Sequence, residues 1–196
     1  GSIVQEDGSY YQDFEDNAQG IYPFVIGNVE GVTDNRTHLA EKNAPYTQRG
    51  WNNKKINDVI DGTWSIKTNG LVQRNKLVYQ TIPQNIRFEA DQEYIVSFEY
   101  EAGSEGTYGL VIGNGEYTGQ ETVIPLAKTI DKGGPQKYEF VIKGHQDEQS
   151  WFGIKSTNKA PDLQGTSDGT ANFGGYKDFM LDNLSVKKVE PIQLEH

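Results

Sequence analysis

Residues 176–186 read YKDFMLDNLSV and form the last apolar segment of the chain. Read with the two-residue period of a β-strand, this segment has apolar residues on both of its sides. One side would carry Met180, Asp182, Leu184 and Val186, and the other Phe179, Leu181, Asn183 and Ser185. A strand that is apolar on both faces is typical of a sheet interior, so we expect a central, buried strand here.

Asp182 is the anomaly in this segment. A buried carboxylate is unfavourable unless it is paired, hydrogen-bonded or bound to a cation, and a hard cation with oxygen ligands would satisfy it. A second acidic motif, DFED at residues 13–16, interrupts an aromatic run near the other end of the chain. We therefore expect acids from both ends to meet at one ion. The alternative is that Glu15 and Asp16 lie in a surface turn and Asp182 caps a neighbouring backbone amide.

The composition favours an all-β protein. With 22 Gly, 11 Tyr and 8 Phe but only 35% hydrophobic residues, the chain has the makeup of many short strands joined by turns. We expect about ten strands at the spacing of a β-sandwich, and no helix. The expected strands are 10–14, 22–26, 38–40, 64–67, 71–82, 94–100, 108–112, 122–127, 137–143, 150–156 and 176–186. In the clearest of them, the inward-facing residues are Tyr94, Val96, Phe98 and Tyr100.

The charge and the cysteine count narrow the possible partners. A formal net charge of -10 without clustered Lys and Arg disfavours nucleic acid and anionic membranes, so a neutral or cationic partner is expected. The absence of Cys excludes a disulfide framework and a thiolate metal site. A bound ion could stabilise such a chain outside the cell, which fits a secreted or cell-wall-attached bacterial protein.

The 196 residues are expected to form one domain. Residues 1–8, which begin Gly-Ser, and 191–196, which end Leu-Glu-His, are expected to be linker and cloning residues, with the domain at 9–190. No apolar segment is long enough to span a membrane.

Catalytic patterns are weak. No Gly-x-Ser-x-Gly or His-Glu-x-x-His motif is present, so no catalytic residue is predicted. The run EADQE at residues 89–93 superficially resembles the carboxylate strand of laminarinase-like jelly-roll glycosidases, whose chemistry needs two carboxyl groups about 5 Å apart. A solvated turn that precedes the strand at 94–100 is the preferred interpretation.

Two tryptophans are candidates for sugar stacking. Sugars present apolar C–H faces to an aromatic ring, while neighbouring polar side chains hydrogen-bond their hydroxyl groups. Trp64 is expected in the core, whereas Trp51 lies in a polar loop and Trp151 faces away from its apolar neighbours. The predicted carbohydrate-binding residues are Tyr46, Arg49, Trp51, Asn52 and Trp151.

Four stretches together resemble the galactose-binding-like β-sandwich that is shared by carbohydrate-binding modules of xylanases and related glycosidases. They are residues 13–15, 61–67, 94–100 and 179–186. More narrowly, APYTQRGW at 44–51 with DGTWS at 61–65 resembles the galactose-binding-like domain of bacterial endo-α-N-acetylgalactosaminidases. Those large surface enzymes remove the core disaccharide from mucin-type O-glycans.

The resemblance implies a jelly-roll sandwich with a structural Ca2+. Its ligands would be Asp13 and Glu15, the loop at Asp61 or Thr63, and Asp182. It also implies that the catalytic acids of the parent enzyme lie in another domain.

Together these features predict a non-catalytic accessory domain of a secreted or cell-wall-attached glycosidase. Its expected partners are a glycan containing galactose or N-acetylgalactosamine, bound weakly, and the catalytic domain of the parent chain; it is expected to be a monomer. One alternative is a purely structural sandwich that braces the catalytic domain and has no sugar site. Another is an independent jelly-roll enzyme that acts through Glu89 and Glu93.

Overall fold

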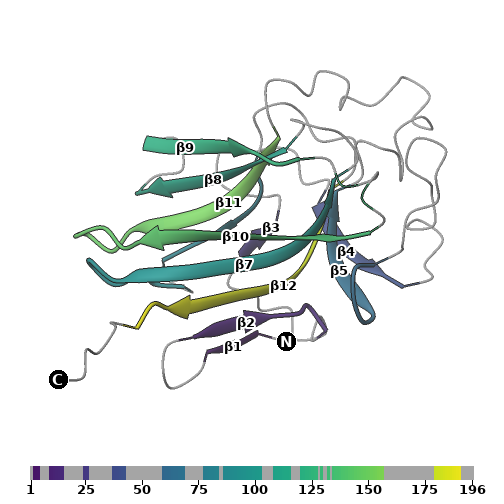
Figure 1. Cartoon of the computed structure of the whole chain (residues 1–196), viewed down its shortest axis with the longest axis horizontal. Coiled ribbons are helices and arrows are strands. Elements are labelled where there is room, and N and C mark those ends of the chain that lie inside the picture. Colours follow the sequence, from purple (N-terminus) through teal and green to yellow (C-terminus); the bar gives the residue numbers. More distant parts are fainter. Residues whose placement is uncertain are drawn as a thin grey trace.

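The structure is a computed structural model of the chain and consists of two packed antiparallel sheets (Figure 1). It describes residues 2–4, 9–15, 24–26, 37–42, 59–68, 77–83, 86–102, 108–115, 120–127, 129, 132, 134–156 and 179–190. Within these ranges there are twelve strands and no helix, and so no helix capable of crossing a membrane. The prediction of an all-β sandwich is confirmed, with twelve strands in place of about ten.

Seven strands form the larger sheet, in which β12 has neighbours on both edges. They are β1 (Ser2–Val4), β2 (Tyr10–Gln12), β4 (Thr37–Glu41), β5 (Trp64–Thr68), β7 (Glu93–Ala102), β10 (Gln136–Lys143) and β12 (Phe179–Lys188). The first of these, β1, pairs with β2, although residues 1–8 were set aside in the sequence analysis.

Five strands form the second sheet, in the order β3-β6-β11-β8-β9. They are β3 (Phe24–Ile26), β6 (Leu77–Thr81), β8 (Tyr108–Asn114), β9 (Gln120–Pro125) and β11 (Ser150–Ser156). Each predicted strand thus has a counterpart, and the main differences lie at the ends of the strands.

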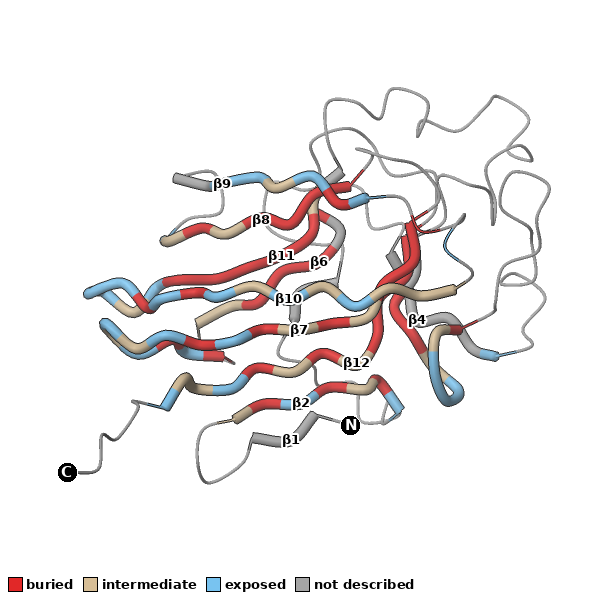
Figure 2. Tube along the Cα trace, viewed as in Figure 1, coloured by how far each residue is buried: buried red, intermediate tan, exposed pale blue. Residues whose placement is uncertain are grey.

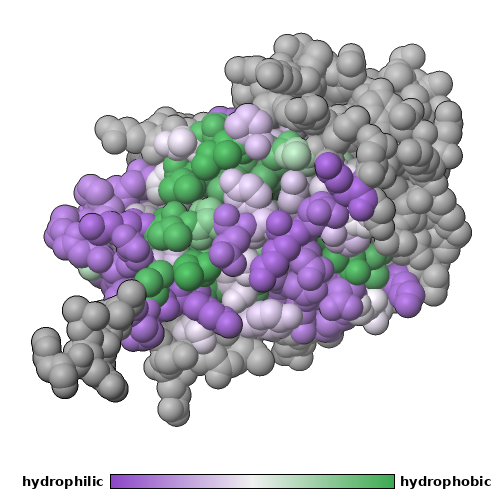
Figure 3. All heavy atoms as spheres, in the orientation of Figure 1, coloured by the Kyte–Doolittle hydropathy of each residue, from purple (hydrophilic) through white to green (hydrophobic). Residues whose placement is uncertain are grey.

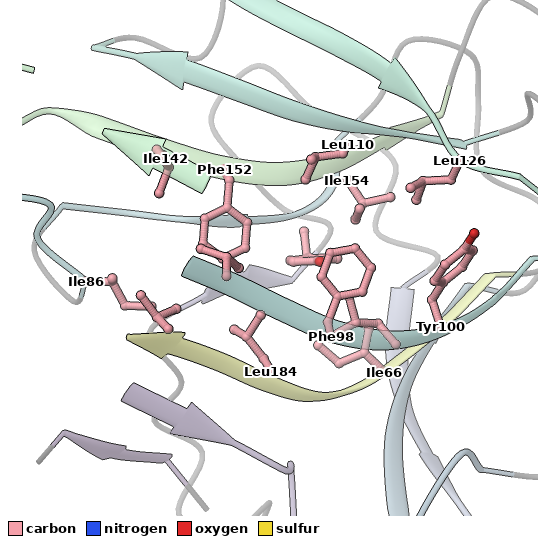
Figure 4. Packing of buried hydrophobic residues seen from close by; sticks show 14 of the residues in the cluster. Ile66, Ile86, Phe98, Tyr100, Leu110, Leu126, Ile142, Phe152, Ile154 and Leu184 are labelled. Carbon is pink, nitrogen blue, oxygen red and sulfur yellow. The ribbon is translucent and has the colours of Figure 1, made fainter. Parts of the chain in front are cut away.

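The core lies between the sheets and is rich in aromatic rings. Tyr94, Val96, Phe98 and Tyr100 of β7 are all buried, as the alternation in the sequence predicts. In Figure 4, Phe98 and Tyr100 of β7 lie opposite Leu110 and Ile154 of the five-stranded sheet. Figure 2 shows buried residues along most of β8, β11 and β12. Burial of large aromatic side chains is therefore the main attraction between the layers.

The central strand β12 departs from simple alternation. Its register against β7 shifts between Asp182 and Ser185, so that three steps along β12 match two steps along β7. One extra residue in an antiparallel pair is a β-bulge. The bulge includes Asn183, which has a φ of 50°, a left-handed conformation that asparagine tolerates better than most residues.

The bulge corrects the predicted faces of this strand. Phe179 and Leu181 before it and Leu184 and Val186 after it all belong to the core cluster. The sequence analysis divided these four residues between two faces because it assumed an unbroken period of two. A one-residue shift exchanges the two faces of a strand, so the bulge brings all four to the core and turns Asp182 away from it.

Deleting Asn183 tests the bulge directly. Without the extra residue, Leu184 and Val186 would point away from the core, so we expect the free energy of unfolding to fall by about 3 kcal/mol or more, as for truncation of a large buried side chain. Urea denaturation measures the loss. The matched control is Asn183→Gly, which keeps the residue count, permits positive φ and should cost about 1 kcal/mol through lost hydrogen bonds. Equal losses in the two variants would contradict the bulge.

Candidate functional site

A gap between two strands opens beside the bulge. On one edge of β12, Met180 and Leu181 pair with β5, whereas Leu184, Ser185 and Val186 pair with β2. Asp182 and Asn183 lie where the edge partner changes. Residues 13–15, which follow β2, and residues 59–63, which precede β5, both reach this point. The two ends of the chain therefore meet here, as the sequence analysis predicts.

Asp182 occupies the gap and is completely buried. Its carboxylate accepts hydrogen bonds from the Ser65 hydroxyl (2.8 Å), the Asp61 amide (3.2 Å) and its neighbour's amide at Asn183 (2.8 Å). Two of these donors are backbone amides, so the amide-capping alternative describes the contacts that Asp182 makes.

Glu15 reaches the same loop from the other end of the chain. Its two carboxylate oxygens lie 2.7 and 3.1 Å from the Thr63 amide, which donates to them. Asp13 orients this turn by accepting a hydrogen bond from the Glu15 amide at 3.0 Å. Gly62 has a φ of +62°, and a side chain there would collide with the Glu15 carboxylate. Glycine is required here by both its conformation and the close approach of Glu15.

Asn183 links the gap to the outer surface of the sheet. Its side-chain amide donates to Asp61 at 3.2 Å and to Glu99 at 3.5 Å, and its carbonyl accepts from the Tyr11 hydroxyl at 3.2 Å. The sequence analysis missed Asn183 and Ser65 as contributors. A polar pair, Asp182-Asn183, in the middle of an apolar strand was the available signal for a bulge.

The electrostatics of the gap are unusual for a protein interior. Burial raises the pKa of Asp182 to about 7, and the charge of Glu15 acts in the same direction, although the hydrogen bonds from Ser65, Asn183 and Asp61 oppose the rise. Within the described residues, neither Asp182 nor Glu15 forms an ion pair with a basic side chain. Among the described residues, the carboxylates of Asp182 and Glu15 thus have no basic partner, which is a costly arrangement.

The donor chemistry suits a hard cation, because every candidate ligand is an oxygen. All five predicted metal residues, Asp13, Glu15, Asp61, Thr63 and Asp182, lie in this region. In the part of the chain that the structure describes, however, no three His, Asp or Glu side chains are arranged to hold a metal ion. The carboxylates instead accept hydrogen bonds from the backbone, and Ca2+ binding remains a prediction.

Of the five residues predicted to bind sugar, the structure describes one. Tyr46, Arg49, Trp51 and Asn52 lie outside the described residues. Trp151 is described, and only 1% of its surface is exposed.

The burial of Trp151 has a clear cause. Its indole lies against Gly113 of β8, where no side chain intervenes, and donates a hydrogen bond to the Gly115 carbonyl at 2.9 Å. A ring enclosed in this way has no face open to a sugar, so the stacking prediction for Trp151 is wrong. The alternation in the sequence correctly placed Trp151 on the opposite face of the strand from Phe152 and Ile154, but it could not show that this side chain is buried.

Residues 89–92 form the turn that the sequence analysis preferred, and Glu93 begins β7. The Gln92 amide donates to the Glu89 carbonyl at 3.1 Å, and Asp91 has a φ of 61°. The Glu89 carboxylate is exposed and accepts a hydrogen bond from Lys188 at 3.2 Å. Exposed acids in a solvated turn lack the enclosed, opposed arrangement that a retaining glycosidase requires.

Comparison with known proteins decides the family. The profile described as galactose-binding domain-like matches residues 4–175. The chain belongs to the galactose-binding domain-like family. This match confirms the fold and the family that the sequence analysis inferred. Galactose-binding-like domains are non-catalytic modules.

Two similar proteins illustrate the relationship of this galactose-binding-like domain. A protein of Renibacterium salmoninarum that is named as an endo-alpha-N-acetylgalactosaminidase is 33% identical over 192 residues, which are 96% of this chain and 11% of that protein. The chain therefore spans about a ninth of the relative's length. A solved structure of the Clostridium thermocellum endo-1,4-beta-D-xylanase 10B, comprising CBM22-1 and GH10 modules with xylohexaose, superposes with a TM-score of 0.52. It is 13% identical and covers 100% of this chain and 30% of that one, which shows a shared fold.

The raised pKa of Asp182 predicts a pH dependence in the presence of a chelator. Its value is about 7 in the folded state against 3.8 ordinarily. Between these values the folded state holds more protons than the unfolded state, so stability falls as pH rises from about 4 to about 7, by on the order of 4 kcal/mol. The contribution of Asp182 to the free energy of unfolding is fully present below about pH 4 and is lost above about pH 7.

The control for this measurement is Asp182→Asn, which cannot ionise. Urea denaturation of both proteins at several pH values gives the difference attributable to Asp182, because other titrating groups contribute equally to both. Parallel curves for wild type and variant between pH 4 and 8 would contradict the raised pKa.

Proposed function

We propose that this galactose-binding-like domain is the non-catalytic, glycan-binding accessory module of an endo-α-N-acetylgalactosaminidase-like enzyme that acts on mucin-type O-glycans. The observation that carries the proposal is the 33% identity to a protein so named, spread over 96% of the chain. Because the chain corresponds to only 11% of that relative, the catalytic residues belong elsewhere in such an enzyme. A secreted or cell-surface location follows from a mucin substrate.

A structural Ca2+ is the second part of the proposal. Three carboxylates, those of Glu15, Asp61 and Asp182, are directed to the gap beside the bulge and lack basic partners among the described residues. Binding would require the Glu15 carboxylate to exchange its amide hydrogen bonds for the ion. When bound, the cation would neutralise the buried charge and join the two chain ends, and it would take no part in catalysis.

A purely structural brace is the second candidate function. The observation that favours it is the burial of Trp151, which removes one of the two aromatic platforms expected for a sugar. Such a module would support the catalytic domain and bind no glycan.

Titration with the core-1 disaccharide, Gal-β1,3-GalNAc, separates the two candidates. We expect millimolar binding by NMR or calorimetry. Because the sequence places Trp51 in a loop beside Arg49, Trp51→Ala should weaken binding about tenfold, whereas Trp51→Phe, which keeps an aromatic face, should retain most of it. Absence of any response at millimolar disaccharide would overturn the glycan-binding proposal in favour of the brace.

Melting in Ca2+ and in chelator tests the ion. A ligand that binds only the folded state at a hundred times its Kd should raise the Tm by roughly 5–10 °C for a domain of this size. Mg2+ at the same concentration is the control for non-specific effects, and Asp182→Asn should abolish the difference. Bound Ca2+ should also remove the fall in stability between pH 4 and 7. The same Tm in Ca2+ and in chelator would retire this part of the proposal.

A further inference from the structure

The outer face of the seven-stranded sheet carries a row of residues that crosses four strands. The register places Tyr11 of β2 opposite Ser185 of β12, Ser185 opposite Ser97 of β7, and Ser97 opposite Glu139 of β10. The chain neighbours of these residues pack into the core, so the row itself points outward. We call Tyr11, Ser185, Ser97 and Glu139 the outer-face row.

Tyr11 provides an exposed aromatic ring at one end of the row, with 42% of its surface accessible. Its hydroxyl is tied to Asn183 of the bulge at 3.2 Å. A ring that is already held in place loses little conformational freedom when a ligand binds.

The middle of the row is formed by two small polar side chains. Ser185 and Ser97 are both partly exposed, and at about 4.8 Å between strands the row extends roughly 14 Å from Tyr11 to Glu139. Serine is short, so the surface between the larger end residues is low and carries hydroxyl groups that donate and accept hydrogen bonds.

Different chemistry borders the row on each side. On one side, Asn183 and Glu99 supply amide and carboxylate groups that are already hydrogen-bonded to each other. On the other side, Ile95 (38% exposed) and Val141 (53% exposed) are cross-strand partners. The space-filling view shows hydrophilic residues next to a smaller hydrophobic patch on the face toward the viewer (Figure 3).

We propose that the outer-face row is a second glycan subsite, made of residues other than those predicted from the sequence to bind sugar. A sugar ring stacks on Tyr11, its hydroxyl groups bond to Ser185 and Ser97, and an adjoining C–H face rests on Ile95. The inference rests on the proposed glycan-binding function.

The experiment is an NMR titration of the whole chain with the core-1 disaccharide. We expect backbone amide shifts at Ser97 and Ser185. Tyr11→Ala should weaken this local response about five- to tenfold, whereas Tyr11→Phe should change it only two- to threefold. Ser97→Gln, which fills the middle of the row, should abolish it.

The matched control is Val123→Ala, which alters a similarly exposed residue (41%) on β9 of the other sheet and should change nothing. Melting curves confirm that each variant folds. Shifts confined to residues 46–52 and unaffected by Tyr11→Ala would overturn the subsite while the proposed function stands; no shift anywhere would overturn both. Shifts at the row that depend on protein concentration without sugar would identify self-association and reject the subsite.

Discussion

The inserted residue in β12 is the constraint on which the rest of the seven-stranded sheet depends. Phe179 and Leu181 precede it, Leu184 and Val186 follow it, and all four reach the core only because the strand shifts by one residue between them. The shift also turns Asp182 out of the core and into the gap between β2 and β5. Packing of the central strand and formation of the acidic site are therefore consequences of the same local geometry.

The gap joins parts of the chain that are far apart in sequence. Glu15 follows the second strand, Thr63 precedes the fifth, and Asp182 lies in the last. Their hydrogen bonds cross separations of 48 and 121 residues. Contacts of such long range cost loop-closure entropy when the chain folds. Neutralisation of the buried carboxylate, by a proton or by a cation, would then stabilise the completed fold.

The functional interpretation rests on family membership and on the surface that this geometry produces. The match to the galactose-binding domain-like family covers residues 4–175, and a two-sheet sandwich leaves outward-facing residues of its strands open to solvent. Tyr11 is positioned on that surface by Asn183, so the bulge connects the buried acids with an exposed aromatic ring. A single strand irregularity thus contributes to both the interior and the exterior of the domain.

The sequence by itself determined the fold class, most strand positions, the buried face of β7 and the meeting of the two acidic ends. Each follows from local periodicity, turn residues or the cost of a buried charge, all of which are properties of short stretches. Tertiary structure alone decided the bulge at Asn183, which exchanges the faces of β12, and the burial of Trp151 against Gly113. The physical reason is that both depend on the neighbouring strand: register is defined between two strands, and a tryptophan is buried or exposed according to the size of the residue opposite it.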